Sequence, residues 1–123
     1  MRKRVTAVVI RDGKVLLVRD KGLASFSLPG GAIKNGEPVK SAAIRELYEE
    51  LGLQSIKVIR LPECDFKGSV NDHKVCLVQA EGEPHLKGQE LDEFVWWDIK
   101  EPITVNSYAH VNNILKRFRS RQK

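Results

Sequence analysis

The stretch from Gly31 to Leu53, GAIKNGEPVKSAAIRELYEELGL, carries the pattern that decides the fold. The run RELYEE at positions 45–50 places three carboxylates on what we predict to be a single helix. Glu46 and Glu50 are one helical turn apart, and Glu49 lies beside them. Like charges at this spacing destabilise a helix by roughly 0.2–0.5 kcal/mol per pair. A hard divalent cation, which takes oxygen ligands, would offset that cost.

We predict that the helix starts near Pro38, which suits a first turn, and runs to about Leu51. Gly52 then supplies the left-handed residue that ends it. On a wheel of 100° per residue the apolar face points away from the three glutamates. That face comprises Ala43, Ile44, Leu47, Tyr48 and Leu51. One side of the helix should therefore pack on a sheet while the other carries the chemistry. The alternative is a solvated acidic face, which would need neither the flanking glycine nor the specific arginine.

The whole stretch resembles the signature box of the Nudix hydrolases: Gly, five residues, Glu, seven residues, then Arg-Glu-apolar-x-Glu-Glu-x-Gly-apolar. A chance match in a chain this long has a probability on the order of 10⁻⁸. The segment LPGG at 28–31 resembles the family's lead-in, and ELDEFVWW at 90–97 resembles its acidic loop before a late strand. The resemblance implies a mixed β-sheet sandwiched between helices, of the α/β or α+β class.

The rest of the chain is compatible with that architecture. Two strands, 5–10 and 15–19, should form a hairpin through the turn at Asp12-Gly13. A break and turn follows at 27–31. Later strands are expected at 55–61, 74–80 and 94–97, with a weaker one near 65–67. An amphipathic helix over about 107–118 should close the chain, with Asn106 as its N-cap. We expect one domain, residues 1–123.

Composition excludes several other classes of protein. The 123 residues are 41% hydrophobic and 30% charged, with a net charge of +5. No apolar run approaches the ~20 residues that cross a bilayer, so we expect no membrane association and a cytoplasmic location. Cys64 and Cys76 lack zinc-site spacing, and we predict free thiols. The three histidines, His73, His85 and His110, show no sequence cluster and are predicted to be incidental. The basic ends of the chain favour a polyanionic partner or are simply solvated.

The resemblance assigns roles to particular residues. The implied metal shell consists of the Gly31 carbonyl, Glu46, Glu49 and Glu50. The expected ion is Mg²⁺, with Mn²⁺ as a substitute. Glu46 and Glu49 are also implied in catalysis, Glu46 as a candidate general base. Arg45 should orient Glu49, or pair with Glu37, rather than form an ordinary surface ion pair. Glu90 and Glu93 are candidates for an extra ligand or base, or are solvated loop carboxylates.

The substrate is a nucleotide by the same resemblance, which is to the short MutT-type branch. That branch converts nucleoside triphosphates, often oxidised purine ones, to the monophosphate and pyrophosphate. Asn106 is a candidate to pair with a purine edge, unless it only caps the last helix. Trp96 and Trp97 must face opposite sides of a strand, and Trp96 either stacks on a base or belongs to the core.

Two other functions stay open at this point. The chain could remove pyrophosphate from RNA 5′ ends, a reaction that its basic termini would serve. It could also be a non-catalytic domain that senses nucleotides, although such a domain has no need of an intact carboxylate box. The sequence does not indicate an oligomeric state.

Overall fold

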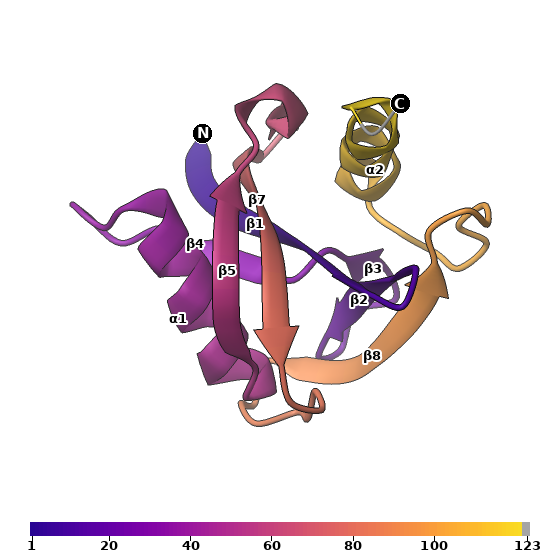
Figure 1. Cartoon of the computed structure of the whole chain (residues 1–123), viewed down its shortest axis with the longest axis horizontal. Helices are drawn as coiled ribbons and strands as arrows, with labels where there is room; N and C mark the ends of the chain where they lie inside the picture. The colour runs from indigo at the N-terminus through magenta and orange to yellow at the C-terminus, as the bar shows by residue number, and fades with distance from the viewer. Residues whose placement is uncertain (122–123) are drawn as a thin grey trace.

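The structure is a computed structural model that describes residues 1–121 (Figure 1). Its strands are β1 (Arg2–Arg11), β2 (Lys14–Asp20), β3 (Phe26–Ser27), β4 (Gly30–Ala32), β5 (Gln54–Arg60), β6 (Phe66–Lys67), β7 (Asn71–Glu81) and β8 (Leu91–Asp98). Its helices are α1 (Val39–Leu51), the short 3₁₀ turn η1 (Pro62–Cys64) and α2 (Ala109–Arg121). None of the described helices is long and apolar enough to span a bilayer.

The strands form a mixed sheet with β1 near its centre. Its main path runs β3-β2-β1-β7-β5, while β4 pairs with β1, β6 with β7 and β8 with β2. The long β1–β7 pair is parallel, and the other pairs are antiparallel. The parallel pair needs a long crossover, and α1 lies within that connection. This arrangement brings the N-terminal strand alongside residues about 70 positions later in the chain.

Two hydrophobic clusters hold the helices on opposite faces of the sheet (Figure 1). Residues of β1 alternate between them because successive side chains of a strand point to opposite faces. Val5, Ala7 and Val9 pack with α1, whereas Val8 joins the cluster that contains α2. The expected architecture, a mixed sheet between helices, is confirmed.

Most expected elements are present with shifted ends. The hairpin turn has Asp12 at φ 52° and Gly13 at φ 75°, and Gly52 ends α1 at φ 68°. The expected break at 27–31 is wrong in part, since residues 30–32 form β4 against β1. Asn106 does not cap α2, because the helix begins only at Ala109.

The apolar face predicted for α1 needs correction at two positions. Ile44 and Tyr48 are exposed by 46% and 56%, and Lys87 lies over the Tyr48 ring. Ala42 is buried in their place, together with Ala43, Leu47 and Leu51. The buried stripe of α1 is therefore rotated toward Ala42 and Glu50 relative to the predicted face, and the helix packs mainly against β5 and β4.

Candidate active site

Helix α1 presents its three glutamates to different surroundings. Glu46 is half-buried, Glu49 is exposed, and Glu50 is only 9% exposed. The prediction that all three lie on a stripe away from the buried face is therefore wrong for Glu50. The chain after β7 folds over the end of α1, where the Lys87 N–H donates to the Glu50 carbonyl. Glu50 follows Ala43 by seven residues and Leu47 by three, so on the helical wheel it belongs to the buried stripe.

Arg45 ties the carboxylates of the box together. Its Nε and Nη2 donate to the two Glu37 oxygens at 2.8 and 2.9 Å, and Nη1 donates to Glu46 Oε1 at 2.8 Å. Nη1 also reaches Glu49 Oε1 at 3.3 Å, and Nη2 reaches the Ala32 carbonyl at 3.0 Å. Both expected pairings of Arg45, with Glu49 and with Glu37, are thus present. The hydrogen bonds from Arg45 lower the pKa of Glu37 to about 2.

Gly31 lies directly against the Glu46 carboxylate. A Cβ added at Gly31 would lie 2.4 Å from Glu46 Cδ and 2.6 Å from each carboxylate oxygen. The preceding residue, Gly30, is equally tight, since its Cβ would lie 2.0 Å from the Val5 carbonyl oxygen. The two glycines therefore allow α1 to bring a carboxylate to the backbone of β4.

Glu50 and Glu46 are adjacent like charges. Burial raises the pKa of Glu50 to about 9, and the neighbouring carboxylates of Glu46 and Glu90 add to that shift. Glu90, a candidate from sequence, is thus near the box, whereas Glu93 forms an ion pair with Arg19 at 3.2 Å. Of the two loop carboxylates expected at the site, the structure thus places Glu90 near the glutamates of α1.

The residues present fit a hard divalent cation. Carboxylate and carbonyl oxygens are the ligands that Mg²⁺ takes, and Mg²⁺ usually binds through one or two carboxylates plus substrate phosphates. The glycine cradle at Gly31 and the crowded carboxylates of Glu46 and Glu50 supply that chemistry. Within residues 1–121, no three His, Cys, Asp or Glu side chains are grouped so that they could hold a metal ion by themselves. The fit rests on the chemistry of the oxygen donors, since Mg²⁺ commonly takes waters and substrate phosphates as its other ligands.

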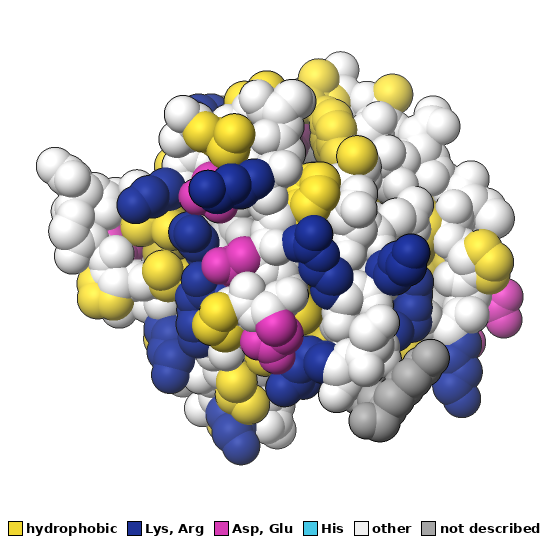
Figure 2. Space-filling view, turned by 90° about the horizontal axis from the view of Figure 1, so that it is seen from above, with side chains coloured by type: hydrophobic (Ala, Val, Ile, Leu, Met, Phe, Trp, Pro, Cys, Tyr) yellow, Lys and Arg dark blue, Asp and Glu magenta, His cyan; other side chains and the backbone are white. Residues whose placement is uncertain are grey.

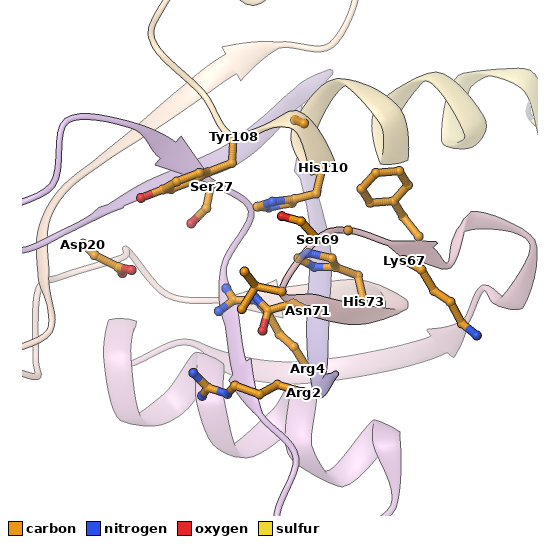
Figure 3. Close-up of a pocket in the computed structure, with 14 residues that line it drawn as sticks. Arg2, Arg4, Asp20, Ser27, Lys67, Ser69, Asn71, His73, Tyr108 and His110 are labelled. Carbon is orange, nitrogen blue, oxygen red and sulfur yellow. The ribbon is translucent and has the colours of Figure 1, made fainter.

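A cavity of about 670 Å³ opens on the α2 side of the sheet (Figure 3). Its lining combines aromatic rings, small polar groups and two arginines from β1. The lining residues used below are Arg2, Arg4, Phe66, His73, Tyr108 and His110. In Figure 3, Arg2 and Arg4 lie at the end nearer α1, and Tyr108 and His110 lie at the end nearer α2. Charged and aromatic groups thus occupy opposite ends of one cavity.

Two of the three histidines, His73 and His110, line this cavity and lie together, although the sequence shows no histidine cluster. The rings of His73 and His110 stack with centroids 4.2 Å apart. Phe66 lies 6.2 Å beyond His73, and Tyr108 lies 6.2 Å beyond His110. Three rings from β6, β7 and α2, with that of Tyr108 just before α2, therefore form one continuous row. Helical periodicity could have predicted that His110 is buried, because it lies one turn before the buried Ile114 on α2. Its contact with His73 depends on the fold.

Both imidazoles are held in the neutral form. Burial and the charge of Arg4 lower the pKa of His73 to about 4. Burial, together with His73 and the charge of Arg4, lowers the pKa of His110 to about 3. The Thr6 hydroxyl lies 2.7 Å from His73 Nδ1, and the Leu28 N–H donates to His110 Nε2 at 3.3 Å. Because His110 Nε2 accepts, its proton is on Nδ1.

Two expected substrate residues lie outside the cavity lining. Trp96 is half-buried, packs against the α1-side core and has the Arg11 guanidinium 5.0 Å from its ring centroid. Trp97 packs on the opposite face, so the predicted alternation of the two rings is confirmed. Asn106 is exposed, two residues before Tyr108, and its carbonyl accepts from the Phe26 N–H. Their roles in substrate binding stay predictions.

Comparison with known proteins places these features in a family. The family profile described as NUDIX domain matches residues 1–118. An RNA pyrophosphohydrolase from Bartonella clarridgeiae is 33% identical over 122 residues, covering 77% of this chain and 70% of that protein. An ADP-ribose pyrophosphatase from Methanocaldococcus jannaschii is 35% identical over 74 residues, covering 54% of this chain and 44% of that one. This chain thus spans less than half of the second relative.

The fold itself matches solved structures. A MutT NUDIX hydrolase from Burkholderia pseudomallei superposes with a TM-score of 0.73 at 24% identity. The superposition covers 92% of this chain and 95% of that structure. At this level of identity the likeness supports the fold alone.

Proposed function

This chain belongs to the NUDIX domain family, and from that membership we propose that it is a Mg²⁺-dependent pyrophosphohydrolase of nucleoside triphosphates. The products would be the nucleoside monophosphate and pyrophosphate. One observation carries the proposal: a cavity of about 670 Å³ is lined by Arg4, whose charge also interacts with Glu50 and Glu46 of α1. Nucleoside pockets commonly combine stacking surfaces with a few polar groups.

The box residues divide the chemical work. Glu46, Glu49, Glu50 and the Gly31 carbonyl would hold the cation, with Glu90 as a further ligand. A bound cation would neutralise charge on the phosphoryl oxygens and lower the pKa of a water. Glu46 is the candidate general base, and Arg45 holds Glu46 and Glu49 in position through its hydrogen bonds. Phosphoryl transfer depends mainly on such positioning and electrostatics.

The row of rings supports a nucleotide as the ligand. An aromatic surface stacks on any base, and such stacking contributes about 1–3 kcal/mol per base. The row ends at Tyr108, whose side of the cavity lies opposite the arginines (Figure 3). A base at that end would direct its phosphates toward Arg4 and the carboxylates of α1.

Removal of pyrophosphate from RNA 5′ ends is the second candidate. The Bartonella relative carries that name. Figure 2 shows Lys and Arg side chains spread widely over one face, with fewer Asp and Glu among them. A basic face gains affinity for a long polyanion through counterion release. A free nucleotide needs no such surface, so the salt dependence of turnover separates the two candidates.

A substrate panel tests the proposal. Purified protein with Mg²⁺ would be given nucleoside triphosphates, including an oxidised purine, triphosphorylated RNA and ADP-ribose, with products separated by chromatography. We expect monophosphate and pyrophosphate from a free triphosphate, and ¹⁸O water locates the attacked phosphorus. Glu49→Gln serves as the inactive control, because Glu49 is exposed and its loss spares the core. Faster release of pyrophosphate from RNA would favour the second candidate, and no turnover of any compound would favour a sensing domain.

A further inference from the structure

Arg4 holds an unusual position on the central strand. It lies on the face of β1 that also carries Thr6, opposite the face where Val5 packs with α1. In register it pairs with Ala32 of β4 on one side and His73 of β7 on the other. A basic side chain at the middle of a sheet is costly to bury, so its partners need to be identified.

The hydrogen bonds of Arg4 leave most of its donors free. A guanidinium has five N–H donors. In residues 1–121, the one recorded acceptor is the Leu28 carbonyl, 3.2 Å from Nη2, and the buried Nε has none. Arg45 and Arg60, by contrast, donate through several nitrogens to carboxylates. Within the described residues, the other N–H donors of Arg4 thus have no protein acceptor and are able to bind a ligand.

Carboxylates surround Arg4 without pairing with it. Burial lowers the pKa of Arg4, while the charges of Glu50, Asp20 and Glu46 oppose that effect. Over the part of the chain that is described, no carboxylate lies within 4.0 Å of its guanidinium. The same charge lowers the pKa of both His73 and His110. The charge of Arg4 therefore acts both on the carboxylates of α1 and on the two histidines that line the cavity.

The neighbouring Arg2 offers a contrast within the same cavity. Arg2 is two residues away on the same face of β1, also lines the cavity, and is exposed. An exposed arginine is well hydrated and gains little from a new acceptor. The half-buried Arg4 has already lost water around Nε, so an anion there restores hydrogen bonds that water does not provide.

We propose that Arg4 binds the phosphate group of the substrate nearest the nucleoside, and so joins the base-binding cavity to the carboxylates of α1. The assignment rests on the proposed function for the identity of the ligand. A guanidinium offers a planar fork that matches two phosphate oxygens, which a lysine ammonium cannot reproduce. Arg4 would hold the phosphate chain in register with the carboxylates, and its loss should weaken binding of phosphate rather than of base.

Binding of metal-free ligands tests this directly. Calorimetry in EDTA would compare guanosine with GMP, and adenosine with AMP, on wild type, Arg4→Gln, Arg4→Lys and the matched control Arg2→Gln. We expect wild type to bind each monophosphate more tightly than its nucleoside. Arg4→Gln should weaken monophosphate binding by about tenfold or more and change nucleoside binding by less than about twofold. Arg4→Lys should keep part of the preference, and Arg2→Gln most of it.

Several results would overturn the assignment. Wild type that binds nucleoside and monophosphate equally overturns it, as does Arg4→Gln that retains the wild-type preference. Equal losses for nucleoside and monophosphate would indicate a structural role. A thermal melt checks folding, and if Arg4→Gln does not fold, Arg4→Lys with an undiminished preference overturns the bidentate contact. An Arg4-dependent preference in a protein without turnover would support Arg4 and refute the proposed function.

Discussion

Replacing Gly31 by alanine should remove most turnover while leaving the protein folded. The added Cβ would lie 2.4 Å from Glu46 Cδ, whereas ordinary contact begins at 3.4 Å. The carboxylate must therefore move by about 1.0 Å, which is 3.4 minus 2.4. Gly31 lies outside the left-handed region, so alanine suits its backbone. A misplacement of about 1 Å at a reacting group can cost on the order of 100-fold in rate.

The stability of this variant should change little. Alanine at a compatible glycine position stabilises a protein by about 0.4–1 kcal/mol through the unfolded chain. Movement of Glu46 weakens its hydrogen bond to Arg45, which is worth about 0.5–1.5 kcal/mol. These effects nearly cancel, so we expect a thermal midpoint within about 5 °C of wild type.

Gly30→Ala is the matched control for this experiment. Gly30 has φ 152°, and its Cβ would lie 2.0 Å from the Val5 carbonyl oxygen, which belongs to the backbone of β1. Backbone cannot yield as a side chain can, so this neighbouring substitution should lower the thermal midpoint strongly. Turnover with Mg²⁺ and circular-dichroism melts would be measured on both variants. Wild-type turnover of Gly31→Ala, or unfolding like that of Gly30→Ala, would refute the claim that Gly31 leaves space for the active position of Glu46.

Three further predictions concern the carboxylates and the buried rings. Glu50→Gln should lose most turnover yet melt no lower than wild type, because it removes a buried carboxylate next to Glu46; near-normal turnover would exclude Glu50 from the site. Arg45→Lys should lower turnover with a small change in thermal midpoint, since one ammonium cannot reach every carboxylate that Arg45 binds; unchanged kinetics would make Arg45 an ordinary surface residue. Acid should destabilise the fold through His73 and His110. Their pKa values in the folded protein, about 4 and 3, lie below the value near 6.5 in the unfolded chain. The unfolded chain therefore binds more protons, and the contribution of these two residues to stability falls as pH drops below 6.5. The raised pKa of Glu50, about 9, acts in the opposite direction over the same range, so the histidine contribution is the difference between wild type and a double His→Gln variant. Between pH 7 and 5, urea unfolding of wild type should lose about 2–4 kcal/mol more than unfolding of the variant, and equal changes in the two proteins would contradict this source.

The local pattern determined the elements that depend on neighbours in sequence. The hairpin at Asp12-Gly13 and the end of α1 at Gly52 follow from residues that adopt positive φ at low cost. The spacing of the box placed Arg45 one turn from Glu49, and their hydrogen bond follows from that spacing. These features are predictable because each depends on contacts within one or two turns of chain.

Only the tertiary structure decided which polar residues are buried and which of them meet. Glu50 lies on the buried stripe of α1, seven residues after Ala43, but only the fold shows which charged groups its carboxylate faces there: Glu46, Glu90 and Arg4. His73 and His110 are separated by a strand, a loop and another strand, yet they stack because β7 and α2 meet on one face of the sheet. Arg4 lies between the carboxylates of α1 and the cavity because β1 pairs with β7 on one side and with β4, which contains Gly30 and Gly31, on the other. Periodicity reports which face of an element is apolar, but the identity of what packs against that face is set by contacts distant in sequence.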